Sequence, residues 1–446
     1  MERRYNWSWV EAQVSQTIEQ WHDLAARPAP GGPRFTLQEQ LKRENAYDEG
    51  LEAVQREAKR ASRGRAERLE AQKRIIAIFP RFASISLGLE DDAIQLLTDG
   101  FLPAGTSLAR WASRFDTTLS MPDIIQACRN AWTVCGLQPL LGDAMQITPS
   151  ILGYSLLYPY SDNYMDHEKV PTTQKLVFSD RFRDRLCGLP VLPRNHHEAA
   201  VWAMVRLIED QYPRVCYPQV FDCLLAIHRG QEASIAQLKH SRACDDVELL
   251  RISCAKGGSS VLADACLSHG RLDDNESRFA FEWGVLLQLG DDLQDVREDL
   301  IHGSVTLFTR AATRRIPLDG LVNQLLYFSD RLASQMDQLP NGTAALKGLL
   351  RMSWRSLVFM AVANSPEFFS RDFLADLEPS SPFRFSFLRA KRTKLAGRRG
   401  LYKVLFEAFL EAGEADNSGL PHPERWLEFS LRPQIAQMAQ PIAVGS

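Results

Sequence analysis

Two segments of the sequence crowd carboxylates at a spacing that suits metal binding. In LLQLGDDLQDVREDL, residues 286–300, Asp291, Asp295 and Asp299 follow one another at intervals of about one helical turn. Asp292 lies three residues before Asp295. Side chains at these intervals share one face of a helix, where like charges repel one another. Mg²⁺ prefers oxygen ligands and is commonly held by one or two carboxylates together with substrate phosphates. The segment therefore predicts a site for divalent cations.

A second acidic cluster occurs earlier in the chain, in YPYSDNYMDHEK. Asp162 and Asp166 are again about one helical turn apart, and Glu168 follows them. Pro159 is expected to start or kink a helix just before this cluster, and Pro171 is expected to end it soon afterwards. The cluster is therefore predicted to lie on a short or broken helix that faces the first acidic segment.

A solvent-facing acidic turn is the alternative explanation for residues 286–300. The residues around and before the aspartates argue against it, because they surround the helix with apolar groups: Phe281, Trp283, Leu286, Leu287 and Leu289. A helix that is apolar on all sides is usually buried. The sequence therefore favours a buried helix whose carboxylates need a counter-charge.

The rest of the chain has the pattern of a helical protein. Apolar residues recur at three- and four-residue steps, and proline- and glycine-rich breaks separate these stretches at residues 26–33, 187–193, 340–342 and 378–382. No segment alternates convincingly as a β-strand would, and no internal repeat is detectable. We therefore predict an all-α fold, with helices over residues 199–212, 277–302, 319–337 and 344–363, the second of them ending at Gly303.

The composition is that of a globular protein, with 446 residues, 45% hydrophobic and 24% charged. The formal net charge of −3 argues against a general binder of nucleic acids or other polyanions. The sequence contains no apolar run long enough to cross a bilayer and no apolar targeting segment at its N-terminus. Its eight cysteines show neither a CxxC pair nor zinc-like spacing. We expect a cytoplasmic protein with reduced thiols.

The first acidic segment resembles a motif of a known superfamily. GVLLQLGDDLQD, residues 284–295, has the spacing of the second aspartate-rich motif of chain-elongating prenyl diphosphate synthases. The stretch from Gln288 to Gly303 is also similar to the second motif of phytoene and squalene synthases, whose DxxxD corresponds to Asp295 and Asp299. The residues in register with the elongating synthases are Gly284, Gln288, Asp291, Asp292 and Asp295.

Three further stretches are similar to the same superfamily, the class I isoprenoid synthases, whose fold is an all-α bundle. DNYMD looks like the first motif in a reduced form, because Asn163 stands second. GQEAS resembles the GQxxD stretch, with Gln231 retained and Ser234 in place of the aspartate. CAKGG occupies the place of a Lys-Thr segment, which implies Lys256 as a diphosphate ligand on a helix broken by the two glycines that follow it. The resemblance covers roughly residues 120–370.

The resemblance implies a Mg²⁺-dependent reaction of a prenyl diphosphate, with three ions bound together with the diphosphate. The expected metal ligands are Asp162, Asp166, Asp291, Asp292, Asp295 and Asp299. The expected catalytic residues are Asp162, Asp166, Asp291, Asp295 and Lys256. The expected substrate-binding residues are Lys256, Arg251, Arg185, Arg297, Gln288, Gln231 and Tyr158.

Ionisation of the allylic C–O bond leaves a carbocation, which needs dry and electron-rich walls. Tyr154 and Tyr158 precede Asp162 at helical spacing and are candidates for such a wall, although aromatic residues at this spacing more often belong to the plain core.

The absence of two basic stretches separates the possible reactions. Elongating synthases hold phosphates with basic residues after both motifs, whereas this chain has HEKVPTTQK and HGSVT there. This favours a class I terpene synthase, which ionises one allylic substrate. The main alternative is a prenyltransferase that joins two prenyl units, by head-to-head condensation or by chain elongation. The other alternative is a catalytically silent homologue that binds prenyl diphosphates.

We predict three parts in the chain. Residues 1–110 form a helical N-terminal extension, in which the highly charged stretch 36–75 is a solvated helical arm. Residues 111–375 form the isoprenoid synthase core. Residues 376–446 form a C-terminal segment, whose basic stretch 389–403 is either a solvated surface helix or a contact with a membrane surface or an anionic ligand. Homodimers are common in this superfamily.

Overall fold

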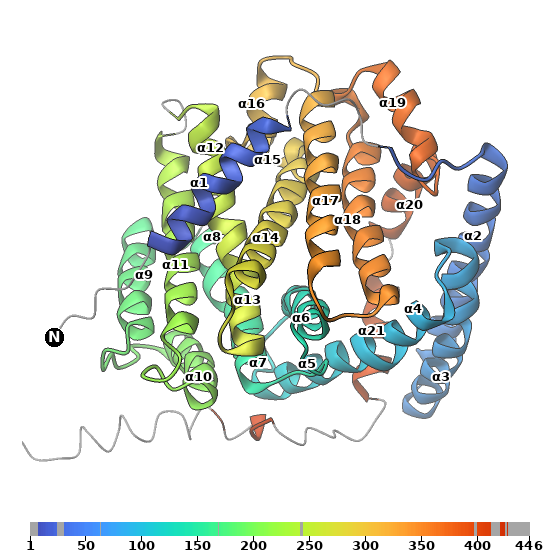
Figure 1. Ribbon diagram of the computed structural model, residues 1–446. Coiled ribbons are helices and arrows are strands. Elements are labelled where there is room, and N and C mark those ends of the chain that lie inside the picture. Colours follow the sequence, from blue (N-terminus) through green and yellow to red (C-terminus); the bar gives the residue numbers. More distant parts are fainter. Residues whose placement is uncertain are drawn as a thin grey trace, which may run out of the picture.

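The computed structural model describes residues 8–24, 31–62, 64–167, 169–240, 244–396, 399–411, 420–423 and 426, without the side chains of residues 166, 234–240, 393–402, 405 and 411. All elements within these ranges are helices, and none is a strand (Figure 1). The predicted all-α fold is therefore confirmed. None of the described helices combines the length and the apolar character that crossing a bilayer requires. The eight cysteines form no disulfide.

The main body is a bundle of helices, and the predicted helices at residues 199–212, 319–337 and 344–363 are confirmed as α10, α17 and α18. Its principal helices are α5 (Leu102–Phe115), α6 (Met121–Leu141), α7 (Pro149–Leu157), α9 (Thr172–Leu186), α10 (His196–Gln211), α11 (Pro218–His240), α12 (Asp246–Ser253), α13 (Ser259–His269), α14 (Asp274–Gln294), α17 (Asp319–Gln338) and α18 (Ala344–Asn364). Shorter helices follow α14 and α18: α15 (Val296–His302), α16 (Leu307–Thr313), η5 (Pro366–Phe368), α19 (Arg371–Leu377) and η6 (Glu378–Ser380).

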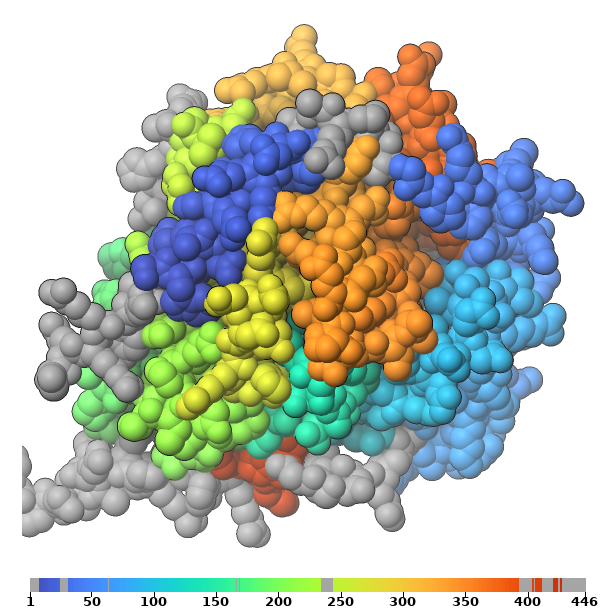
Figure 2. All heavy atoms as spheres, viewed as in Figure 1, coloured from blue at the N-terminus to red at the C-terminus, as the bar shows by residue number. Residues whose placement is uncertain are grey.

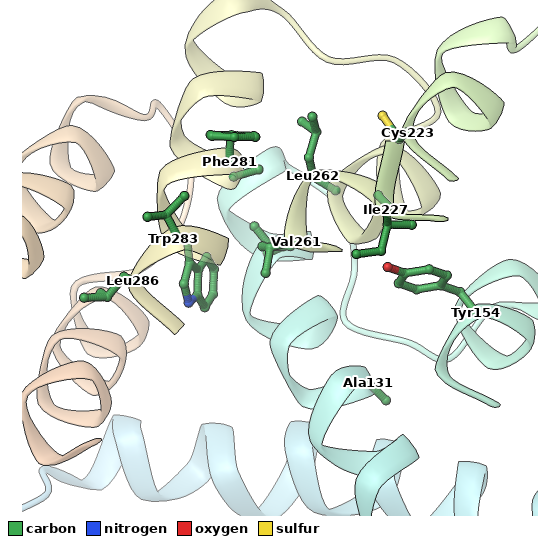
Figure 3. Packing of buried hydrophobic residues seen from close by; sticks show 14 of the residues in the cluster. Ala131, Tyr154, Cys223, Ile227, Val261, Leu262, Phe281, Trp283 and Leu286 are labelled. Atoms are coloured by element: carbon green, nitrogen blue, oxygen red, sulfur yellow. The ribbon is translucent and has the colours of Figure 1, made fainter. Parts of the chain in front are cut away.

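Helix α13 lies at the centre of the bundle, in contact with α6, α7, α11 and α14. Figure 3 shows Val261 and Leu262 of this helix between Trp283 of α14 and Ile227 of α11, all of them buried in one hydrophobic core. Burial of this apolar surface is the main force that holds the surrounding helices together. Two of those helices, α11 and α14, carry predicted site residues.

Helix α14 carries the first acidic segment. The Asp273 side chain caps its N-terminus by accepting the backbone N–H of Glu276, and the Glu276 side chain accepts the N–H of Asp273 in return. The predicted helix over residues 277–302 is interrupted at Asp295 (φ −94°, ψ 5°), after which α15 begins. Helix α15 ends at Gly303, as predicted, because glycine readily adopts the left-handed φ of 76° found there.

The charged stretch 36–75 is helical, as predicted, but its inner face is not solvated. It forms α2 (Leu37–Ala61) and α3 (Arg65–Phe82), which pack on each other. Buried Glu44 accepts two hydrogen bonds of 3.0 and 2.5 Å from the Arg384 guanidinium through its Oε2, and Lys391 pairs with Asp48. The next helices are η1 (Ala83–Leu87), α4 (Asp91–Gln95) and η2 (Leu96–Phe101). We call α2 and α3 the N-terminal arm.

The C-terminal segment contributes two helices to this side of the molecule, α20 (Phe385–Ala396) and α21 (Arg399–Glu411). Helix α20 packs on α18, and α21 packs on α2 and α3. The basic stretch 389–403 falls on these helices, but most of its side chains lie outside the described residues. The N-terminal arm is therefore held against the bundle by segments from the far end of the chain.

Helix α1 (Ser8–Asp23) packs on the main body rather than on the N-terminal arm. Val14, Ile18 and Trp21 are buried in the main core, and the helix contacts α12 and α14. In Figures 1 and 2, α1 is the dark blue helix that crosses the face formed by α11 to α14. The predicted extension over residues 1–110 therefore contains two parts with different packing.

Candidate functional site

Asp162 lies at the end of a wide helical turn. Helix α7 ends at Leu157 and continues as the π-helical turn η3 (Tyr158–Asp162), which is followed by the short α8 (Asn163–Asp166). Pro159 has no backbone N–H to continue α-helical hydrogen bonding, so the predicted broken helix is confirmed. From α11, the Gln231 Nε2 atom donates a hydrogen bond to Asp162 Oδ1 at 2.5 Å. This bond joins the acidic cluster around Asp162 and Asp166 to the predicted GQ stretch, which contains Gln231.

Asp292 is buried on α14 and accepts two hydrogen bonds. Gln288 Nε2 donates to its Oδ1 atom, and the Ser253 hydroxyl donates to its Oδ2 atom, both at 2.8 Å. Burial raises the pKa of Asp292 to about 6, although both hydrogen bonds and the positive charge of Lys256 act in the opposite direction. Gln288, Ser253 and the positive charge of Lys256 therefore stabilise this carboxylate, taking the part that water plays for an exposed aspartate.

Asp291, Asp295 and Asp299 form the acidic stripe that the sequence predicts. Asp291 is exposed, and the other two are half-buried. Burial raises the pKa of Asp295 to about 6, with a further contribution from the negative charges of Asp291, Asp299 and Glu298. Burial and the charges of Asp291 and Glu298 also raise the pKa of Asp299. The carboxylates thus repel one another across the break between α14 and α15.

The helix that carries Lys256 is broken at two glycines, as predicted. The π-helical turn η4 (Cys254–Gly258) separates α12 from α13. A Cβ atom on Gly257 would lie 2.6 Å from the carbonyl oxygen of Gly284 on α14. A Cβ atom on Gly230 of α11 would lie 3.1 Å from the Cα atom of Lys256. Glycine therefore lets the backbones of α11, η4 and α14 approach one another around Lys256.

These contacts connect the two acidic motifs through α11 and η4. Helix α11 binds Asp162 through Gln231 and touches the backbone of Lys256, whose charge acts on Asp292. Within the described ranges, no three His, Cys, Asp or Glu side chains are placed to hold one metal ion together. The side chains of Asp166 and Ser234, and the whole of Glu168, lie outside the part of the chain that the structure describes.

The three predicted arginines have carboxylate partners. Arg185 is buried and forms two hydrogen bonds with Glu209 of α10, of 2.6 and 2.5 Å. The Arg297 Nε atom donates to Glu367 at 2.8 Å. The structure therefore pairs these two guanidinium groups with residues outside the acidic motifs. The third arginine, Arg251, forms two longer ion pairs. Its Nη1 atom lies 3.7 Å from Oε2 of Glu11 on α1, and its Nε atom lies 3.6 Å from Oε2 of Glu248.

The predicted aromatic residues line a small cavity. The ring centroids of Tyr154 and Tyr158 are 5.7 Å apart, and both hydroxyls contact Ser260 of α13. Together with Asp162 and Gln231, the tyrosines line a cavity of about 30 Å³. A cavity of this size has room for only a few water molecules. In this conformation the space beside Asp162 is therefore too small for a prenyl chain.

Asp264 is a buried polar residue of α13 that was not predicted. Its Oδ1 atom accepts a hydrogen bond of 3.0 Å from Asn130, and its Oδ2 atom has no partner among the described residues. Burial raises the pKa of Asp264 well above its usual range. The only signal in the sequence is one acidic residue in the apolar run SSVLADACL, where pattern alone does not reveal complete burial.

Replacing Asp264 with asparagine should stabilise the fold at neutral pH. Burial raises the folded-state pKa of Asp264 above the unfolded value of about 3.9, so the wild type loses stability as the pH rises above that value. Asparagine can keep the bond with Asn130 and does not ionise. In urea denaturation, the gain in free energy of unfolding should increase as the pH rises above about 4. A difference that does not depend on pH would contradict this assignment.

Comparison of the chain with protein-family models, with curated proteins and with solved structures gives no match.

Proposed function

We propose that this protein is a Mg²⁺-dependent class I terpene synthase, with a class I isoprenoid synthase bundle as its core. It ionises an allylic prenyl diphosphate and releases diphosphate, giving a cyclic or linear terpene. The observation that carries this proposal is the position of Lys256. Its charge acts on Asp292, while the helix that touches its backbone also holds Asp162 through Gln231. A cation between two acidic motifs suits an anionic substrate that bridges them through metal ions.

The carboxylates fit Mg²⁺ as hard oxygen donors. Mg²⁺ usually keeps several waters and takes only one or two carboxylates, with substrate phosphates at other positions, so a group of three protein ligands is not required. Asp162 and Asp166 on one side, and Asp291 and Asp295 on the other, would hold the ions. When bound, the ions withdraw electron density from the leaving diphosphate.

The chain's own residues would orient the leaving group. Lys256 would donate to a diphosphate oxygen, while Gln231 and Gln288 keep Asp162 and Asp292 in position. The allylic C–O bond breaks, and both of its electrons leave on the diphosphate oxygen. The remaining carbocation then loses a proton, or takes up water and loses a proton, to give a neutral product.

The walls beside Asp162 would exclude water and stabilise the cation. Tyr154 and Tyr158 present aromatic rings there, and ring electrons attract a positive charge. Because the cavity holds only about 30 Å³, the substrate must widen it. The residues that would move apart lie on α7, η3, α9 and α11, which line this space.

A prenyltransferase that joins two prenyl units is the second candidate. The observation that favours it is the proximity of Asp295 and Asp299, since the charge of Asp299 raises the pKa of Asp295 across the helix break. This pair corresponds to the DxxxD by which the chain resembles phytoene and squalene synthases.

The two candidates differ in what they need besides one allylic substrate. Purified protein with Mg²⁺ should be given geranyl, farnesyl or geranylgeranyl diphosphate, each with and without isopentenyl diphosphate, and the extracted products should be identified by mass. A terpene synthase gives a hydrocarbon or terpene alcohol without the acceptor. Products that require isopentenyl diphosphate, or that contain two joined allylic units, would instead establish the prenyltransferase.

Lys256 and Arg297 offer a matched test of the substrate-binding residues. Lys256→Gln should lower kcat/KM for the allylic diphosphate by roughly a hundredfold, because it removes a cation that contacts the leaving group. Arg297→Gln should change kcat/KM by less than about threefold, because its guanidinium pairs with Glu367. Steady-state diphosphate release measures both values, and equal losses in the two variants would contradict the role given to Lys256.

A further inference from the structure

A large apolar cavity lies between the N-terminal arm and the bundle, apart from the small cavity beside Asp162. Its volume is about 510 Å³, within the range of roughly 300–1,000 Å³ that is typical of small-molecule sites. The wall combines residues from α3, η2, α5, α6, α14, α18 and α21. Its aromatic members are Phe79, Phe101, Trp132, Trp283, Trp354 and Phe409. Burial of a hydrocarbon chain against this apolar wall would be favourable, because it removes apolar surface from water.

The polar groups of this cavity are few and distinct. Among the described residues that line it, Arg129 is the only charged one, and it is exposed. Trp132 also lines the cavity and is 38% exposed, so these two residues of α6 mark where the cavity reaches the surface. The indole N–H groups of Trp283 and Trp354 have no hydrogen-bond acceptor among the described residues, but they are fully buried behind the rings and add no polar surface to the cavity. The cavity thus combines an apolar interior with a cation at its rim.

We propose that this cavity binds a single-chain amphiphile with an anionic head. The hydrocarbon chain lies against the aromatic residues of α14, α18 and the N-terminal arm, where it replaces water at little polar cost. The head stays at the surface beside Arg129, whose guanidinium binds carboxylate or phosphate oxygens. An acyl carboxylate and a prenyl monophosphate share this chemistry.

The binding site gives the N-terminal arm a function. Ile75, Ile76 and Phe79 of α3 form one wall of the cavity. The arm is held there by the ion pairs of Glu44 and Asp48 with the C-terminal segment. The charged outer face of the arm is then exposed to solvent, while its inner face contacts the ligand.

Tryptophan fluorescence can test this proposal without Mg²⁺ and without turnover, because three tryptophans line the cavity. The full-length protein in EDTA should be titrated with palmitate, with farnesyl monophosphate and with neutral farnesol. We expect a saturable change in emission with at least one of the two anions. Farnesol should bind roughly three- to tenfold more weakly than farnesyl monophosphate, since it lacks the charge-assisted contact. The anion that binds more tightly identifies the type of head.

Variants that fill the cavity separate this site from binding elsewhere. Ile76→Phe on α3 and Leu349→Phe on α18 should each weaken anion binding at least tenfold, because they occupy the space of the chain. Met352→Phe on the same helix α18 faces a different cavity, of about 650 Å³, and should leave the affinity within about twofold. Arg129→Gln should reduce the preference for farnesyl monophosphate over farnesol to about one.

Two results would overturn the proposal. One is the absence of a saturable signal with both anions. The other is wild-type affinity in Ile76→Phe and in Leu349→Phe, when circular dichroism shows that both variants keep their helical content. Neither result bears on diphosphate release, since the assay contains no Mg²⁺ and no allylic diphosphate.

Discussion

Replacement of Asp295 with alanine should reduce diphosphate release by roughly a thousandfold while leaving the protein folded. Asp295 lies at the junction of α14 and α15, where burial and three neighbouring negative charges raise its pKa to about 6. At neutral pH Asp295 is mainly ionised, and this ionised form destabilises the folded protein relative to the unfolded chain. Removing it relieves repulsion, so the melting temperature of Asp295→Ala at pH 7 should equal or exceed that of the wild type.

The expected combination of lost activity and retained stability separates a metal ligand from a structural residue. Glu298→Ala is the matched control, because Glu298 is an exposed carboxylate of the same acidic segment. It should keep diphosphate release within about threefold of the wild type. Near-wild-type release in both Asp295→Ala and Asp162→Ala would remove the basis for a metal site.

Gly257→Ala should destabilise the protein by about 1–3 kcal/mol and also impair the site. The added methyl group would lie 2.6 Å from the Gly284 carbonyl oxygen, and it would also collide with Gln288 on the same helix. Because both contacts involve packed parts of α14, η4 must move away from that helix. Lys256 and the Gln288–Asp292 hydrogen bond would move with it, so we expect diphosphate release to fall by at least tenfold.

Gly348→Ala in α18 is the control for the general effect of glycine replacement in a helix. A Cβ atom there meets no heavy atom within 4 Å, so alanine should stabilise α18 by about 0.5–1 kcal/mol. Urea denaturation of the two variants measures both free energies of unfolding. A Gly257→Ala variant as stable as the wild type would contradict the close approach of η4 and α14.

The helices of the bundle could be predicted because their apolar spacing and their proline and glycine breaks are local properties. The broken helix at Pro159 and the break at Gly257–Gly258 were predicted for the same reason. The break at Asp295 was not, because no proline or glycine marks it. This break depends on the direction in which the acidic segment runs away from the core, and that direction is determined only in the folded chain.

Partners of charged residues could not be predicted from spacing. Arg185 and Arg297 were expected at the diphosphate, yet they pair with Glu209 and Glu367. Nothing in the local sequence of Asp264 indicates that Asn130 would be its partner. Such pairs join helices that are distant in sequence, so only the packing of the bundle determines them.

The packing of the two ends of the chain could not be predicted from the sequence pattern either. Helix α1 and the N-terminal arm are both helical and amphipathic, but one covers α12 and α14 while the other packs on α21. The 510 Å³ cavity arises from this arrangement, since its walls come from helices between α3 and α21. Hydrophobic periodicity identifies the apolar faces but not the faces that they meet.

We propose that this chain ionises an allylic prenyl diphosphate with the help of Mg²⁺. The most direct test is diphosphate release from the wild-type protein given geranyl, farnesyl or geranylgeranyl diphosphate alone, once with Mg²⁺ and once with EDTA. We predict release from at least one substrate with Mg²⁺ and none with EDTA, accompanied by a terpene hydrocarbon or alcohol. Absence of release from all three substrates, in protein whose circular dichroism shows a folded helical bundle, would contradict the claim.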